Sequence, residues 1–132
     1  MLAQNFKTAQ ELGIEEPLYR ALQTVLKRLE TNDLIHDTRY NTTLPNAFCM
    51  NIDKCASKCG TVACLAGWAS IEMGVRVSDV IHNECLDRLF YPGDNYDYDA
   101  ITTEMAAIAL RNYFTTGIID WSHAPRYGDA EE

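Results

Sequence analysis

Apolar residues recur at intervals of three and four between residues 16 and 30, which is the spacing of one face of an α-helix. This face consists of Leu18, Leu22, Val25, Leu26 and Leu29. Pro17 lies in the first turn, where proline costs no intrahelical hydrogen bond, and acidic residues at the start with basic residues near the end suit the helix dipole. The pattern predicts a helix over about 16–30, and a shorter one over 3–12 that ends at Gly13.

Small residues mark another predicted helix, over 62–73. Thr61 can cap its first turn, and Gly74 suits the left-handed position that ends a helix. One strip of this helix consists of Ala63, Ala66, Gly67 and Ser70. Because glycine inside a helix costs about 1 kcal/mol, we expect another helix to pack closely against this strip, with Trp68 as an anchor of the core.

Two further helices are predicted toward the carboxyl end. The first spans 79–90 and is capped by Ser78. The second spans 103–116, beginning after Thr102 and ending at Gly117. We expect the inward side chains of these two helices to be Ile81, Cys85, Leu86, Leu89 and Phe90 in the first, and Met105, Ile108, Ala109 and Tyr113 in the second.

Residues 31–58 show no sustained period and are rich in asparagine and aspartate, which is typical of a long irregular connection with at most short extended pieces, expected around Phe48 and Met50. A short hairpin within 35–50 is compatible with the sequence. Long loops in compact domains are uncommon and often functional. The whole pattern predicts a mainly α fold, a compact bundle of about four to five helices. It forms one domain over 1–128, followed by a frayed acidic tail over 129–132.

The composition is that of a folded protein. The chain has 132 residues, of which 47% are apolar and 23% charged, enough to bury a core without metals or disulfides. No apolar run is long enough to span a membrane, and the first residues lack the pattern of a signal peptide. We therefore expect a cytoplasmic protein whose five cysteines stay reduced.

The negative charge is concentrated in the last third of the chain. The formal net charge is −8, yet residues 1–58 hold seven acidic and seven basic side chains, whereas 94–132 hold eight acidic and two basic ones. Such a surface disfavours direct binding of nucleic acid or an anionic membrane and favours a protein partner with a basic surface, although it can also serve solubility alone. The candidate binding residues are Asp94, Asp97, Asp99 and Glu104. The oligomeric state stays open.

Four cysteines fall within one short stretch of the chain: Cys49, Cys55, Cys59 and Cys64. Four thiolates can bind zinc tetrahedrally, but the intervals of five, three and four residues differ from the two-residue interval of a zinc knuckle. No cofactor is therefore expected, and a structural zinc site is kept as an alternative.

A thiol nucleophile is a further alternative. Cys59 or Cys64 near the start of the helix over 62–73 would have its thiolate favoured by the helix amides and dipole. Catalysis would also need a base, for which His82 is the candidate beside His36 and His123, although no spacing connects a histidine to a cysteine. The simpler interpretation is that the cysteines are small core residues and that Cys59-Gly60-Thr61 begins the helix tightly.

The run Cys59-Gly-Thr-Val-Ala-Cys-Leu-Ala-Gly-Trp-Ala69, with Phe48-Cys-Met50 before it and Gly117-Ile-Ile-Asp-Trp121 after it, carries a resemblance. Over roughly residues 45–122 the chain resembles a family of uncharacterised small proteins of bacteriophages and bacteria. The resemblance implies a structural motif made of Cys59, Gly60, Thr61, Cys64, Gly67 and Trp68. It also implies that Cys49 and Cys55 lie outside the motif, and that an accessory role such as blocking a host defence protein is plausible.

These observations favour a non-enzymatic binding or regulatory protein that contacts a partner through its acidic surface. Three alternatives stay open: a cysteine-dependent enzyme, a zinc-binding structural module, and a protein that sequesters a small ligand.

Overall fold

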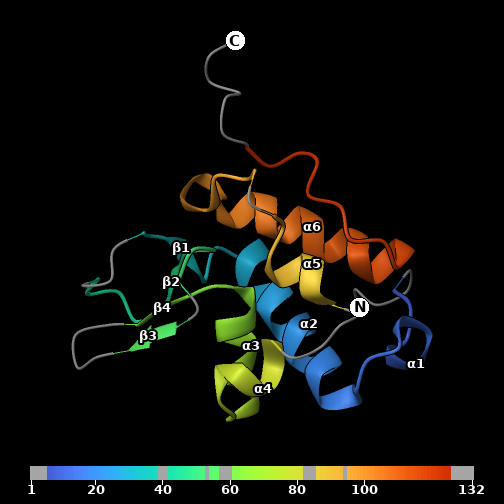
Figure 1. The fold of residues 1–132 in the computed structure, drawn as a ribbon. Coiled ribbons are helices and arrows are strands. Elements are labelled where there is room, and N and C mark those ends of the chain that lie inside the picture. The colour runs from blue at the N-terminus through green and yellow to red at the C-terminus, as the bar shows by residue number, and fades with distance from the viewer. Residues whose placement is uncertain are drawn as a thin grey trace.

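A computed structural model describes residues 6–38, 42–52, 54–56, 61–81, 86–93 and 95–125, with the backbone alone for 54–56. Its helices are α1 (Ala9–Leu12), α2 (Glu16–Glu30), α3 (Leu65–Met73), α4 (Val77–Ile81), α5 (Asp87–Phe90) and α6 (Thr103–Thr116), with a 3₁₀ turn, η2 (Tyr98–Ala100). Its strands are β1 (Ile35–His36), β2 (Ala47–Phe48), β3 (Lys54–Ala56) and β4 (Thr61–Ala63). The fold is helix-rich and mixed α/β (Figure 1).

Helix α2 lies at the centre of the molecule, with α6 packed on one side and α3 on the other (Figure 1). Its bounds match the predicted helix over 16–30, and the whole predicted apolar face is buried. Leu22 and Val25 are fully buried, and each such side chain contributes about 1.5 to 3 kcal/mol through burial. The periodicity of this segment therefore located the central element of the core.

Helix α6 confirms the prediction for 103–116, because the Thr102 hydroxyl accepts a hydrogen bond from the Met105 amide and Gly117 takes the left-handed conformation. The inward assignment of Ile108 is wrong, since 48% of this residue is exposed. The side chains buried against α2 and the rest of the core are Ala106, Ala107, Ala109, Leu110, Tyr113 and Phe114. On a helix of 3.6 residues per turn, Ile108 lies on the side opposite to this stripe.

The stretch over 31–58, predicted as irregular, contains three strands, and one of them, β2, includes the extended piece expected around Phe48. With β4 they form a sheet in the order β1-β2-β4-β3, in which β1, β2 and β4 are parallel and β3 is antiparallel to β4. The hairpin expected within 35–50 is therefore wrong, and the mainly α fold class is corrected to mixed α/β. Strands of two or three residues are too short to show alternation, and both residues of β2 are buried.

The predicted helix over 62–73 begins later than expected. Thr61 is not its cap but the first residue of β4, and Cys64 takes the N-cap position of α3. The end at Gly74 is confirmed by its left-handed conformation. Three members of the small-residue strip, Ala66, Gly67 and Ser70, are buried in α3, which contacts both α2 and α4.

The remaining helical predictions are corrected in part. In place of one helix over 79–90, the described residues form α4 and α5; Ser78 lies inside α4, and residues 82–85 are outside the described part. At the amino end, the described part of the helix predicted over 3–12 forms only α1; the Thr8 hydroxyl caps it by accepting a hydrogen bond from the Glu11 amide, and the predicted stop at Gly13 is confirmed. Within the described residues, no helix combines the length and apolar character that crossing a membrane requires.

The opposite environments of Leu22 and Ile108 give a direct test of this packing. We expect Leu22→Ala to lower the free energy of unfolding by about 2 to 5 kcal/mol, because it removes a fully buried side chain and leaves a cavity. Ile108→Ala is the matched control and should change it by less than about 0.5 kcal/mol. Urea unfolding followed by circular dichroism measures both, and equal losses in the two variants would contradict the arrangement of α2 and α6.

Candidate functional site

The described part of the cysteine motif is a turn from strand to helix. Thr61 lies in β4, Cys64 joins β4 to α3, and Gly67 and Trp68 follow in the first turns of α3, whereas Cys59 and Gly60 lie outside the described residues. Cys64 is 1% exposed. A thiol at this joint is therefore shielded from any molecule that approaches from solvent.

Trp68 connects the helices to the sheet. Its indole Nε1 donates a hydrogen bond to the backbone oxygen of Ala47 in β2, at 2.9 Å, and the residue is 3% exposed. The guanidinium carbon of Arg28 lies 4.6 Å from the centre of the Trp68 ring. This distance suits a cation–π interaction, worth about 0.5 to 2 kcal/mol depending on burial.

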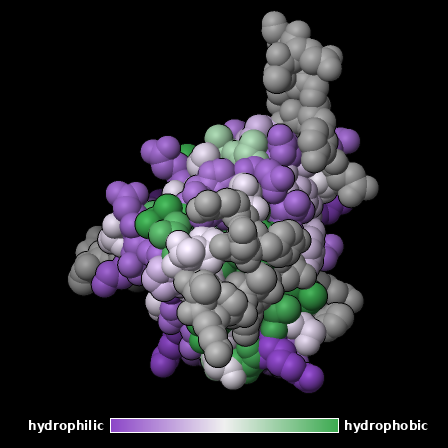
Figure 2. All heavy atoms as spheres, turned by 90° about the vertical axis from the view of Figure 1, so that its left-hand side faces the viewer, coloured by the Kyte–Doolittle hydropathy of each residue, from purple (hydrophilic) through white to green (hydrophobic). Residues whose placement is uncertain are grey.

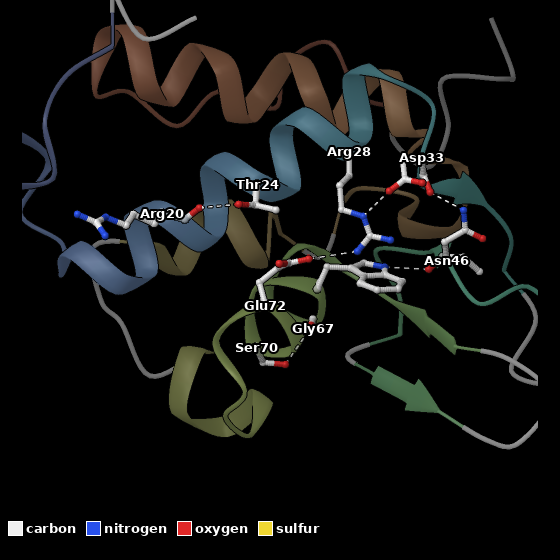
Figure 3. A network of polar contacts seen from close by, with 10 residues as sticks. Arg20, Thr24, Arg28, Asp33, Asn46, Gly67, Ser70 and Glu72 are labelled. Atoms are coloured by element: carbon white, nitrogen blue, oxygen red, sulfur yellow. Dashed lines mark hydrogen bonds and ion pairs between the residues drawn. The ribbon is translucent and has the colours of Figure 1, made fainter. Parts of the chain in front are cut away.

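Arg28 also binds two carboxylates (Figure 3). Its Nε lies 2.7 Å from Oδ2 of Asp33 and its Nη1 lies 3.3 Å from Oε2 of Glu72. The side-chain amide of Asn46 donates to the backbone oxygen of Asp33. Arg28 in α2 is thereby held to the loop before β1 and to α3, so the described motif residues belong to the joint between the helices and the sheet.

Cys49 follows β2 and is fully buried. Its thiol donates to Oδ1 of Asp99 at 3.6 Å. Burial, reinforced by the negative charge of Asp99, raises the pKa of the Cys49 thiol from the ordinary 9.0 to about 11, although the backbone amides of Asn51 and Ile52 act in the opposite direction. The thiol is protonated at neutral pH, the state that lacks the nucleophilicity of a thiolate.

His36 reaches the same residue from the neighbouring strand. Its Nε2 lies 2.9 Å from the backbone oxygen of Asp99, and because a carbonyl oxygen can only accept, Nε2 carries the proton. His36 and Cys49 thus both hold η2 against the ends of β1 and β2. No pattern in the sequence indicates that His36, Cys49 and Asp99 are in contact. They lie apart along the chain, and the parallel pairing of β1 and β2 brings His36 and Cys49 to the same edge of the sheet.

The predicted zinc ligands can be followed only in part. Cys49 and Cys64 are buried, the side chain of Cys55 is not described, and Cys59 lies outside the described residues. Among the side chains that are described, no three of His, Cys, Asp or Glu gather into a metal-binding group. His82, the candidate base, also lies outside the described residues.

Three of the four candidate binding carboxylates lie on the described surface. Asp97 precedes η2, Asp99 is exposed within it, and Glu104 is exposed in the first turn of α6, while Asp94 is outside the described residues. The Asp97 amide donates to the backbone oxygen of Pro125, which holds this segment to the last described residues. Figure 2 shows the face on the left of Figure 1, where hydrophilic residues surround small hydrophobic groups.

Glu104 borders an open groove of about 750 Å³ between the end of α2 and the start of α6. The groove is lined chiefly by Leu29, Glu30, Glu104, Met105, Ile108 and His123. Arg111 binds both carboxylate oxygens of Glu30, each at 2.6 Å. The His123 ring donates from Nε2 to the backbone oxygen of Met105 at 2.9 Å. Sequence reasoning identified Glu104 by its charge but missed the groove.

Comparisons of the chain with protein-family models, with curated proteins and with solved structures find no match. The resemblance to small phage and bacterial proteins therefore stays a prediction, and so does the accessory role that it implies.

The raised pKa of Cys49 predicts a specific loss of stability in alkali. A group whose pKa is higher in the folded state stabilises the fold below its unfolded pKa, here 9.0, and this contribution is lost as pH rises toward about 11. We expect urea unfolding to show that Cys49→Ala removes about 2 kcal/mol of the pH dependence in this interval.

Tyr19, whose pKa is also raised by burial and by the charges of Glu16 and Glu11, is present in both proteins. The difference between wild type and Cys49→Ala therefore reports on Cys49. Parallel stability curves for the two proteins from neutral pH to strong alkali would show that the thiol does not titrate as inferred.

The hydrogen bond from Trp68 gives a separate prediction. Trp68→Phe keeps an aromatic ring near Arg28 but leaves the backbone oxygen of Ala47 without this donor, which should cost about 1 to 3 kcal/mol in urea unfolding. Arg20→Lys is the control, because Arg20 forms only an exposed pair with Glu16 and its change should be nearly neutral. A Trp68→Phe variant as stable as the control would mean that the bond to Ala47 contributes nothing to stability.

Proposed function

We propose that this protein is a non-enzymatic binding protein whose acidic surface, formed by Asp97, Asp99 and Glu104, contacts a basic surface of a partner protein. The observation that carries the proposal is the state of these carboxylates. Within the described residues, none of the three lies within ion-pair distance of a basic side chain. Elsewhere in the described part, five carboxylates are paired with arginines: Glu16, Glu30, Asp33, Glu72 and Asp79.

A surface carboxylate that is not paired with a cation keeps its electrostatic field in the surrounding solvent. Several such groups attract a positively charged surface, raise the rate of encounter and repel acidic molecules. A carboxylate already held by arginine has most of its charge compensated locally. The acidic surface is therefore better suited to contact with a basic protein than the paired carboxylates of α2 and α3.

Neither of the two described thiols, Cys49 and Cys64, is suited to nucleophilic catalysis. The raised pKa keeps Cys49 protonated at neutral pH, and Cys64 is nearly inaccessible. A catalytic cysteine needs both thiolate character and access to its substrate. The resemblance to phage and bacterial proteins supports a biological setting in which the contact blocks a host protein.

A salt titration with a basic probe tests the proposal. The probe is a synthetic peptide of about 15 residues that contains lysine and serine but no apolar side chain. We expect the dissociation constant, measured by calorimetry, to rise on the order of tenfold between about 20 and 150 mM salt, because the contact is electrostatic and exposed.

Matched variants locate the contact. The triple change Asp97→Asn, Asp99→Asn and Glu104→Gln should weaken binding, whereas Glu15→Gln, Glu16→Gln and Asp79→Asn remove the same charge elsewhere and should have little effect. Equal losses in the two triple variants would mean that net charge alone attracts the peptide. Absence of binding by the wild type at low salt would overturn the proposed function.

A further inference from the structure

We infer that the groove between α2 and α6 is a docking surface for a partner segment that carries an aliphatic side chain next to a lysine or arginine. This inference rests on the proposed function and deepens it, because it names the place on the acidic surface where contact is made and the chemistry of the occupant. The α2/α6 groove is defined by Leu29, Glu30, Glu104, Met105, Ile108 and His123.

The apolar part of the α2/α6 groove comes from α6. Ile108 is 48% exposed, on the side of α6 opposite to its buried stripe, and Met105 lies one turn earlier on the same groove. A single exposed isoleucine is common on protein surfaces. Ile108 differs from Ile118, which is 64% exposed, because Ile108 lines a concavity of about 750 Å³ where a partner side chain can be enclosed.

The charges of the α2/α6 groove select the neighbour of that aliphatic side chain. Its acidic residues are Glu30 and Glu104, and neither lysine nor arginine is among the residues that line it. Arg111 occupies both oxygens of Glu30, whereas Glu104 has no such pair within the described residues. An occupant without a cation would partly desolvate the Glu104 carboxylate without forming a compensating ion pair, and an acidic occupant would be repelled.

The walls of the α2/α6 groove are held in place before any partner arrives. The double hydrogen bond between Arg111 and Glu30 joins α6 to α2, and Arg111 also lies over the ring of Phe6, 5.4 Å from its centre. His123, which also lines the groove, stacks on Trp121 with ring centres 6.0 Å apart. A surface fixed in this way loses little conformational freedom on binding.

A second groove, between the start of α2 and the end of α3, is a weaker candidate. It has a volume of about 590 Å³ and its charged residues are Glu16, Arg20 and Glu72. Glu16 is paired with Arg20 inside the groove, and Glu72 is paired with Arg28. Its carboxylates are thus compensated by this chain, so no charge is left there to select an occupant.

The probe for the α2/α6 groove is an amidated peptide of about 15 residues, alanine-based, with leucine and lysine four positions apart, so that both lie on one face if it is helical. Binding is measured by calorimetry and by the shift of the Ile108 methyl signals in nuclear magnetic resonance. We expect Ile108→Ser to weaken binding on the order of tenfold, because the change removes the aliphatic contact.

The charge is tested at the same site. Glu104→Gln should weaken binding of the leucine–lysine peptide about two- to fivefold at low salt, the range of an exposed ion pair. Ile118→Ser and Glu15→Gln are the controls: they change an exposed isoleucine and an exposed carboxylate outside the groove, and should leave the affinity unchanged. A peptide with glutamate in place of lysine should bind poorly to the wild type and better to Glu104→Lys.

The outcomes separate this inference from the proposed function. Unchanged affinity in both Ile108→Ser and Glu104→Gln would overturn the groove, while the lysine–serine peptide would still report whether the acidic surface binds basic chains. Equal binding of an uncharged leucine–serine peptide would overturn the requirement for a cation. If neither basic peptide binds the wild type, both the groove and the proposed function are wrong.

Discussion

The placement of Arg28 between an aromatic ring and two carboxylates is the interaction on which the arrangement of helices and sheet depends. Arg28 projects from the last turn of α2, where it contacts Trp68 and Glu72 of α3 and Asp33 before β1. With 22% of its side chain exposed, Arg28 is partly shielded from water, so these charged contacts are screened less than those of a surface pair. Trp68 then extends the connection to β2 through its hydrogen bond to Ala47. Arg28 and Trp68 together thus connect α2, α3 and the sheet.

The acidic surface is built on this joint. Because β1 and β2 are fixed relative to α2, His36 and Cys49 have a defined position from which both bind Asp99. Asp99 lies three residues before Thr102, the cap of α6, so η2 and the first turn of α6 are positioned together. Two donors hold this surface from within the fold, the buried thiol of Cys49 and the half-buried ring of His36, while its carboxylates lie on the solvent side.

Sequence periodicity predicted the long helices, whose hydrogen bonds are local in the chain. Helix α2 and helix α6 have enough turns to show one apolar face, and their ends carry a proline or a glycine with a clear conformational reason. The sheet escaped prediction because its strands are too short to alternate and pair in parallel across intervening segments. Ile108 was predicted to face inward because Met105, Ile108 and Ala109 recur at helical spacing and suggest one apolar face. The buried stripe of α6 has the same spacing on another side of the helix, and the sequence alone does not tell which of the two sides contacts α2. Glu104 was found from charge density, which needs no knowledge of the fold.

The cysteines and the carboxylates divide the chemistry of this protein between its interior and its surface. Cys64 is a small side chain at the point where β4 turns into α3, and Cys49 is a buried donor whose pKa is raised by its surroundings. Burial and the nearby carboxylate of Asp99 oppose the formation of a thiolate at Cys49, and burial shields Cys64 from solvent. Carboxylates have the reverse requirement, since their charge is stable in water and acts at a distance only while no cation compensates it. The two described cysteines therefore belong to the interior of the fold, and in the function that we propose, contact with other molecules is made by the acidic side chains at its surface.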